Sequence, residues 1–163
     1  MRARRIRPDD GPLLRSIRLR ALEGAPDAFG TTLAQAIAYP DNAWEQRASE
    51  CASSNTTSLF FAEDDGVVAG MAGGGFEAGD PMPSLISMRV EPHARGRGGG
   101  EALAEAVAAW ARERGAARLQ LWVTETNAPA IALYRLMGFL DTGETQVLPS
   151  NPALRERRMV RDL

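Results

Sequence analysis

The feature that most constrains this chain is an apolar strand that runs through a loop of arginine and glycine into an amphipathic helix. The pattern of Ser84–Val90 predicts the strand, and that of Glu101–Arg114 predicts the helix. The first turn of a helix has unpartnered backbone N–H groups and a partial positive charge, so it favours an anion. Arginine adds charge there, and glycine lets a bulky anion approach the backbone. We therefore predict a pyrophosphate site at Arg95, Gly96, Arg97, Gly98, Gly99 and Gly100.

Three kinds of phosphate-binding loop can be compared with this run. A Walker loop needs a lysine, and all 19 basic residues of this chain are arginine. A dinucleotide-binding loop, G-x-G-x-x-G, fails because its third glycine position falls on Glu101, although Glu125 follows the next predicted strand, where a ribose-binding acid would lie. The third pattern, [Arg/Gln]-x-x-Gly-x-[Gly/Ala], fits the run from Arg95 to Gly100.

Length and composition limit the remaining possibilities. With 163 residues and 44% apolar residues, we expect one folded domain over residues 1–163. A net charge of −2 provides no basic field for nucleic acid. One cysteine, Cys51, excludes an internal disulfide, and with one histidine, His93, it argues against a structural metal site. Because neither a secretory signal nor the ~18 apolar residues of a membrane helix are found, we expect a cytoplasmic protein without a membrane partner.

The segment ahead of the glycine loop shows helix and strand patterns with no linker and no repeat. The predicted elements are a strand at Ala3–Arg7, a helix between Pro12 and Glu23, a helix at Asp41–Ala52, and strands at Thr57–Glu63 and Val67–Phe76. The segment Pro8–Pro12 is expected to cap the first helix, with the acids Asp9 and Asp10 at its start. The two strands are predicted to form a hairpin around Asp64-Asp65-Gly66. The run Gly73–Gly75 is expected to kink or bulge the second of these strands.

The helix that follows the loop has the clearest pattern in the chain. Leu103, Val107 and Trp110 lie on one face, and Gly115 is placed to end the helix. The later elements are a strand at Arg118–Thr124, a helix from Asn127 to Gly138, and strands at Phe139–Glu144 and Glu156–Val160 joined by a loop with Pro149 and Pro152. The predicted order is therefore β-α-α-β-β-β-α-β-α-β-β. Asn127 is expected to cap its helix.

Two motifs in this order resemble those of the GCN5-related N-acetyltransferases. The first is the Arg95–Gly100 loop preceded by Val90-Glu91-Pro92, which resembles the acyl-CoA loop of that family. The second is Asn127 followed by the segment 130–139, which resembles the family block Asn-x-x-Ala-x-x-x-Tyr-x-x-x-Gly-Phe. The order of elements is also that of the family, whose α/β fold has a central mixed β-sheet flanked by helices. The specific residues extend from about Met88 to Phe139.

The resemblance implies an enzyme that moves the acetyl group of acetyl-CoA to a primary amine by direct attack in a ternary complex. It implies that the Arg95–Gly100 loop binds the pyrophosphate and that Met88, Arg89 and Val90 pair with the pantetheine amides. It further implies that the backbone N–H of Val90 stabilises the oxyanion and that Asn127 binds the pantetheine arm. Tyr134 takes the place of the acid that protonates the leaving thiolate, for which a phenol with a pKa near 10 is suited. Tyr39, the other tyrosine, is a weaker candidate.

The general base and the acceptor stay open at this stage. Glu91, Glu125 or a chain of water molecules could take the amine proton. In this fold the acceptor site is formed by Leu22–Trp44 and Gln146–Leu154, within which Asp27 could attract an amine and Phe29, Tyr39 and Trp44 could form walls. The acceptor is expected to be a small molecule or a protein N-terminus, and a homodimer is plausible. The alternative is a non-catalytic module that binds or senses acyl-CoA.

Overall fold

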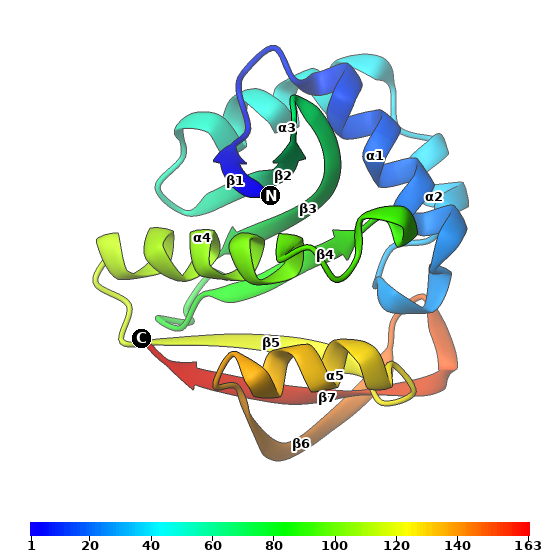
Figure 1. The fold of residues 1–163 in the computed structure, drawn as a ribbon. Coiled ribbons are helices and arrows are strands. Elements are labelled where there is room, and N and C mark those ends of the chain that lie inside the picture. Colours follow the sequence, from blue (N-terminus) through cyan, green and yellow to red (C-terminus); the bar gives the residue numbers. More distant parts are fainter.

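The computed structural model describes residues 1–163 and contains a seven-stranded mixed sheet, with helices on both of its faces (Figure 1). The strands lie side by side in the order β1-β2-β3-β4-β5-β7-β6, and β4 and β5 are its parallel neighbours. The strands are β1 (Arg2–Arg5), β2 (Thr57–Asp64), β3 (Val67–Gly75), β4 (Ser84–Val90), β5 (Arg118–Thr124), β6 (Leu140–Leu148) and β7 (Asn151–Asp162).

Five helices and two short 3-10 turns connect these strands. The helices are α1 (Gly11–Gly24), α2 (Leu33–Ile37), α3 (Asp41–Ser53), α4 (Gly99–Glu113) and α5 (Ala128–Leu136), and the turns are η1 (Pro26–Ala28) and η2 (Pro92–Ala94). The predicted mixed α/β fold is confirmed. Among the strands and α-helices, the predicted order lacks only the short helix α2, which begins at a capping box between Thr32 and Gln35.

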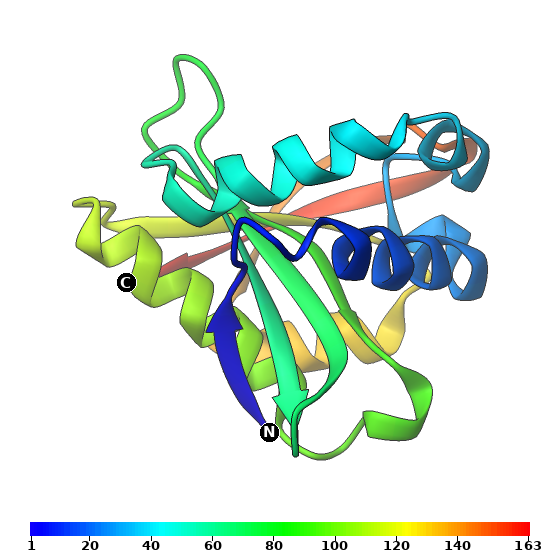
Figure 2. The same cartoon turned by 90° about the horizontal axis from the view of Figure 1, so that it is seen from above.

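The sheet separates two hydrophobic cores because successive side chains of a strand point to opposite faces. On β2, Phe60 and Ala62 pack with α4 and α5, whereas Leu59 and Phe61 pack with α1 and α3. Figure 2 shows the two helical layers on either side of the strands. The central strands β2 and β3 are thus buried on both faces, which makes them a rigid support for β4 beside them.

Helix α4 forms as its sequence pattern predicts. Leu103 and Val107 are fully buried and Trp110 is 3% exposed, all within the core beneath the sheet. The helix ends at Gly115, whose φ of 78° is left-handed, and the N–H of Ala116 donates to the carbonyl of Ala111 at 3.1 Å. The amphipathic pattern and the glycine together therefore determine where α4 lies and where it stops.

Strands β4 and β5 diverge, and this divergence creates the main opening of the molecule. Their ladder contains one pair, Ser84 with Gln120, at the start of β4. On its other side β4 stays paired with β3, but an extra residue of β4 lies between the pairs Met71–Arg89 and Gly73–Ile86. This β-bulge contains Ser87, which has a left-handed φ of 57°. The bulge bends β4, and the strand leaves β5 along the rest of its length.

The expectation that Gly73–Gly75 bulges its own strand is wrong. The extra residue that β3 does contain lies between Val68 and Gly70, and the run itself pairs regularly with β2. The glycines serve close packing instead. A Cβ on Gly74 would lie 2.9 Å from the Trp110 ring, because α4 crosses the sheet at that point.

Two other local expectations need correction. The carboxylate of Asp10 does not cap α1 but turns back to accept from Arg4 and from the N–H of Arg7. The last two strands are longer than predicted and form a tight hairpin, in which Leu148 pairs with Asn151 and Pro152 lies within β7. None of the helices is both long and apolar enough to cross a membrane.

Candidate active site

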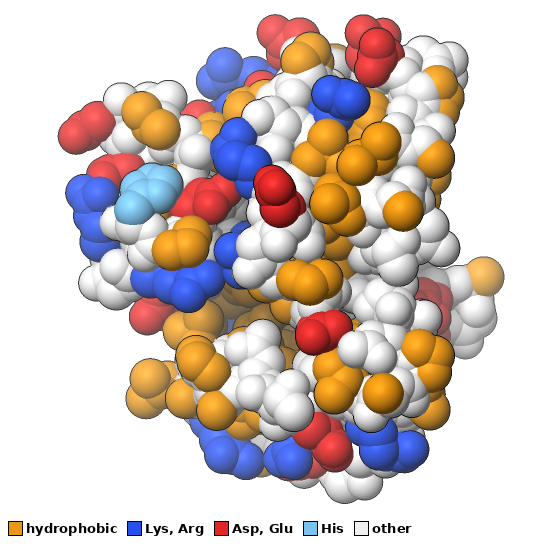
Figure 3. Space-filling view, turned by 90° about the vertical axis from the view of Figure 1, so that its right-hand side faces the viewer, with side chains coloured by type: hydrophobic (Ala, Val, Ile, Leu, Met, Phe, Trp, Pro, Cys, Tyr) orange, Lys and Arg blue, Asp and Glu red, His pale blue; other side chains and the backbone are white.

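A cleft of about 840 Å³ opens where β4 and β5 diverge. The C-terminal end of α1 and turn η1 form one wall, and the start of α4 together with α5 forms the other. Figure 3 shows this hollow across the middle of one face of the molecule, with hydrophobic side chains at its floor. The cleft therefore joins elements that are distant in the sequence.

The start of α4 carries the glycine loop into the cleft. Gly98 has a left-handed φ of 77° at the N-cap position, and its carbonyl accepts the first helical hydrogen bond, from Ala102 at 3.0 Å. The N–H groups of Gly99, Gly100 and Glu101 precede that bond, so they have no acceptor within the helix. A Cβ on Gly100 would lie 2.8 Å from Leu133 of α5, so glycine here lets the two helices approach closely. The loop thus presents free donors beside α5.

Most of the predicted donor-site residues lie on this cleft, and two do not. The lining includes nine of the predicted residues, Met88, Arg89, Val90, Arg95, Gly96, Gly99, Gly100, Asn127 and Tyr134. Gly98 is absent from the lining and acts through its backbone turn. Arg97 also lies outside and forms an ion pair with Asp64 of β2, so its charge is directed away from the cleft.

The free edge of β4 faces the cleft with its backbone. The N–H of Glu91 donates to Ala69 of β3 at 2.8 Å. Because successive N–H groups of a strand point to opposite sides, the N–H and carbonyl of Val90 point away from β3, toward the gap beside β5. The Arg95 guanidinium donates to that carbonyl at 3.2 Å and thereby positions the loop against the strand. The Val90 N–H is the predicted oxyanion donor.

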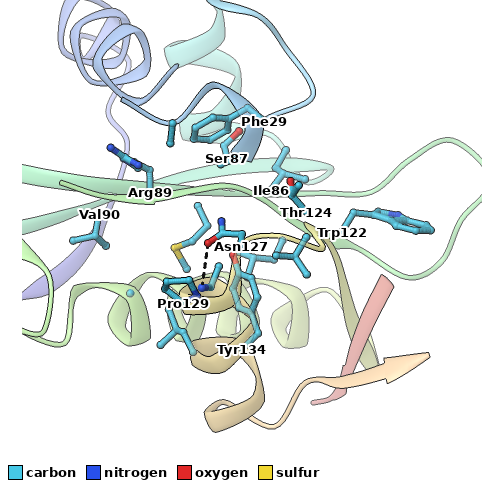
Figure 4. Close-up of a pocket in the computed structure, with 18 of the residues that line it drawn as sticks. Phe29, Ile86, Ser87, Arg89, Val90, Trp122, Thr124, Asn127, Pro129 and Tyr134 are labelled. Carbon is cyan, nitrogen blue, oxygen red and sulfur yellow. Dashed lines mark hydrogen bonds between the residues drawn. The ribbon is translucent and has the colours of Figure 1, made fainter. Parts of the chain in front are cut away.

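Tyr134 lies on α5 with its ring packed in the core and its hydroxyl toward the cleft. The residue is 7% exposed, and its ring contacts Phe139 edge-on with centroids 5.8 Å apart. Burial raises the pKa of the Tyr134 phenol well above its ordinary value, with no charged neighbour opposing the shift. Figure 4 shows the hydroxyl pointing toward Asn127. The phenol is therefore held in its protonated form, as a proton donor must be.

Asn127 caps α5 as expected. Its Oδ1 accepts from the N–H of Ala130 at 3.4 Å (Figure 4). This bond uses the acceptor end of the side-chain amide and leaves the Nδ2 donors available to the cleft. Pro129 in the first turn has no N–H to satisfy, which suits it to the start of a helix.

Neither Glu91 nor Glu125, the two candidate general bases, lines the cleft. Glu91 pairs with Arg20 at 3.1 Å, and Glu125 faces Arg157 at 4.0 Å. The cleft instead contains Glu156 of β7, which is 8% exposed and accepts from Gln146 at 2.9 Å. Sequence reasoning missed Glu156 because nothing near it in the chain marks it. It reaches the cleft because β7 pairs antiparallel with β5, which places it opposite Thr124.

The opposite wall contains part of the predicted acceptor region. Asp27 and Phe29 line the cleft, whereas Tyr39 is half-exposed outside it and Trp44 is buried in the α1–α3 core. The segment Gln146–Leu154 does not line the cleft but fastens this wall.

Three hydrogen bonds hold the wall in place. The Thr124 hydroxyl donates to the Asp27 carbonyl at 2.5 Å, the Asn151 amide donates to the Asp27 carboxylate at 3.1 Å, and Ser150 donates to the Phe29 carbonyl. These bonds tie the connection after α1 to β5 and to the last hairpin. The cleft wall is therefore fixed by residues about a hundred positions away in the chain.

Known proteins resemble this chain in sequence and in fold. Residues 24–139 match the model of the acetyltransferase (GNAT) family. Streptothricin acetyltransferase of Streptomyces lavendulae is 44% identical over 79 residues, which cover 48% of this chain and 42% of that protein. The chain thus matches less than half the length of this curated relative.

Two solved structures match over the whole chain. Ribosomal-protein-alanine N-acetyltransferase from Brucella melitensis has a TM-score of 0.79 and 26% identity, covering 100% of both chains. The structure of yncA from Salmonella typhimurium with its cofactor acetyl-CoA has a TM-score of 0.80 and 21% identity, covering 100% of this chain and 94% of that one. At this identity the second likeness concerns the fold alone.

Proposed function

This chain belongs to the acetyltransferase (GNAT) family, and from that premise we propose that it transfers the acetyl group of acetyl-CoA to a primary amine. The observation that carries the proposal is the divergence of β4 and β5. It gathers the Val90 backbone, the Arg95–Gly100 loop and the Tyr134 hydroxyl around one cleft. We propose that residues 1–163 act as one domain in this reaction.

The donor is proposed to bind along the free edge of β4. The N–H groups at the start of α4, together with Arg95, suit a pyrophosphate, because they offer a partial positive charge and donors without partners. The exposed backbone of Met88–Val90 suits the pantetheine amides, which would pair with it as an added strand does. The free Nδ2 of Asn127 would donate to the same arm. These features support acetyl-CoA as the donor.

The proposed reaction is a direct attack. The amine nitrogen attacks the thioester carbonyl, and the Val90 N–H stabilises the oxyanion that forms. The C–S bond then breaks, and the thiolate takes the phenolic proton of Tyr134. Because a buried phenol is a poor anion, the resulting tyrosinate regains a proton from solvent or from the acid that accepted the amine proton.

Glu156 is proposed as the group that receives the amine proton. It is the buried carboxylate of the cleft, and its bond from Gln146 leaves the second oxygen free. Glu156→Gln preserves the shape and removes the charge. We expect it to lower kcat about 100-fold or more and to leave acetyl-CoA binding unchanged, as measured by thiol release and by calorimetry. Unchanged turnover in this variant would return the role to a chain of water molecules.

The acceptor is proposed to be a small amine or a peptide N-terminus. Relatives support both: one is a streptothricin acetyltransferase, and a full-length structural match is a ribosomal-protein-alanine N-acetyltransferase. The wall around Asp27 and Phe29 is the proposed acceptor side, because it faces the cleft opposite the α4–α5 wall.

Thiol release from acetyl-CoA with a panel of amines and peptides tests the function. Arg95→Ala should raise the KM for acetyl-CoA about tenfold, since it removes a charged donor from the loop. Arg112→Ala is the matched control, because Arg112 lies at the far end of the same helix beside Glu105. Binding of acetyl-CoA without turnover of any amine would favour the non-catalytic module. Absence of binding would overturn the proposal.

A further inference from the structure

Arg18 of α1 lies on the proposed acceptor side of the cleft, beside Phe29, and forms no ion pair with an acidic residue. Its guanidinium stacks 4.5 Å above the centre of the Phe29 ring, and one of its nitrogens donates to the Ser87 hydroxyl at 3.1 Å. Of the five N–H donors of a guanidinium, this bond uses one. Both Phe29 and Ser87 line the cleft with Arg18, so the remaining donors are available to a ligand.

The charge of Arg18 is only partly compensated. Burial lowers the pKa of Arg18, Tyr39 opposes this shift, repulsion from Arg47 adds to it, and no carboxylate takes part. Arg4 provides the contrast, since this partly buried arginine pairs with both Asp10 and Glu63. Even a partly buried charge without an ionic partner is costly, so an arginine kept in this state is suited to receive an anion from solution.

The surroundings of Arg18 hold it in position for such a ligand. Ser87 occupies the β4 bulge, where its left-handed φ of 57° is unusual for a residue other than glycine. That conformation turns the hydroxyl toward Arg18. Figure 4 shows Ser87 and Phe29 across the strand gap from Tyr134. A second cation, Arg89, also lines the cleft, and its Nε is buried without a partner.

We propose that the acceptor is a zwitterion, an amine with a nearby anionic group, and that Arg18 and Ser87 bind this anionic group. Carboxylate and phosphonate both match a guanidinium fork. The buried carboxylate of Glu156 lies in the same cleft and suits the ammonium end. The inference rests on the proposed acetyl transfer and narrows its substrate class to amino acids and their analogues.

Calorimetry on the complex of the protein with CoA tests the subsite directly. A panel of α-amino acids is titrated, each paired with its α-amide, which keeps the amine and removes the negative charge. An aminophosphonate of the same skeleton distinguishes a carboxylate from a phosphonate site. We expect at least one acid or phosphonate to bind about tenfold or more tightly than its amide. Arg18→Met should abolish that difference, and Arg18→Lys should restore part of it.

Arg15→Met is the matched control, because Arg15 lies one turn earlier on α1 and pairs with Asp41 at the surface. It should leave the acid–amide difference intact. Ser87→Gly suits the left-handed backbone and removes the side chain with its hydroxyl, so it reports on the subsite if Arg18→Met fails to fold. We expect a several-fold loss of acid binding in Ser87→Gly.

The outcomes separate this inference from the proposed function. An acid–amide difference that is absent across the panel, or that persists in Arg18→Met, overturns the subsite. Turnover of neutral amines with no preference for acids also overturns it, and the proposed acetyl transfer then stands. Binding of acids that depends on Arg18, without any thiol release, supports the subsite and contradicts the proposed transfer.

Discussion

The chemistry proposed for Tyr134 depends on where its ring lies. The α5 helix buries the ring against Phe139, which raises the pKa of the phenol, while the hydroxyl faces the cleft. Tyr134→Phe removes the hydroxyl and keeps the packing. We expect kcat to fall about 100-fold or more, with unchanged acetyl-CoA affinity, in a thiol-release assay. A variant as active as the natural protein would contradict the role of acid.

The same burial has a consequence for pH. A phenol whose pKa is raised stays protonated through pH 10, the ordinary value for tyrosine. Loss of the acid should therefore cause no decline in kcat between pH 8 and about pH 10.

Asp10 is a residue whose ionisation stabilises the fold. Burial alone would raise the pKa of its carboxyl, but hydrogen bonds from Arg4 and from the Arg7 N–H outweigh burial and lower it. Since the folded pKa lies below the unfolded value, this stability is present above about pH 4 and is lost as pH falls through the folded pKa. Asp10→Asn should cost about 1.5–3 kcal/mol at pH 7 in urea unfolding, and less below pH 4. The exposed Asp9→Asn is the control.

At the scale of elements, the position of β4 depends on the small residues of β3. A Cβ on Gly70 would lie 2.8 Å from the Arg89 carbonyl, which is backbone and cannot rotate away. Gly70→Ala should therefore destabilise the protein by about 1–3 kcal/mol and weaken acetyl-CoA binding, as measured by thermal unfolding and calorimetry. Gly75→Ala, on the same strand with its nearest neighbour at 4.0 Å, is the control and should change neither. Equal effects of the two substitutions would contradict this packing account.

At the scale of the whole molecule, the cleft is a junction between the two helical layers. A ligand that bridges the β4 edge and the start of α4 should stabilise the folded state by mass action. At about 100 times its dissociation constant, CoA should add about 2.7 kcal/mol to the free energy of unfolding, seen as a rise in Tm. NADH shares a pyrophosphate with CoA but lacks its pantetheine arm, and it should produce no comparable shift. An equal shift with NADH would indicate a general phosphate site.

Local patterns in the sequence were enough to predict most of the fold. Apolar periodicity located α4, and Gly115 and Gly138 marked where two helices end, because only glycine adopts their left-handed φ easily. Apolar periodicity could not reveal α2, because a helix of five residues has too few turns for a periodic signal. The full lengths of β6 and β7 could not be predicted either, because Pro149 and Pro152 near the turn suggested a loop.

The proposed donor half of the site is close to a linear motif, and local patterns in the sequence were enough to predict it. Both motifs can be recognised within short segments, because strand-to-helix turns and helix faces depend on neighbouring residues. They are the run Arg95–Gly100 and the block from Asn127 to Phe139. Even here only the fold separated Arg95, which faces the cleft, from Arg97, which pairs with Asp64.

The proposed acceptor half can be recognised only in the folded chain. Arg18, Ser87 and Glu156 come from a helix, a bulge and the last strand, and no spacing in the chain relates them. Strand register and the divergence of β4 from β5 bring them together, and these depend on pairing and packing between distant segments. A phosphate loop is built from adjacent backbone groups, whereas a pocket for a small acceptor needs side chains that converge from separate elements.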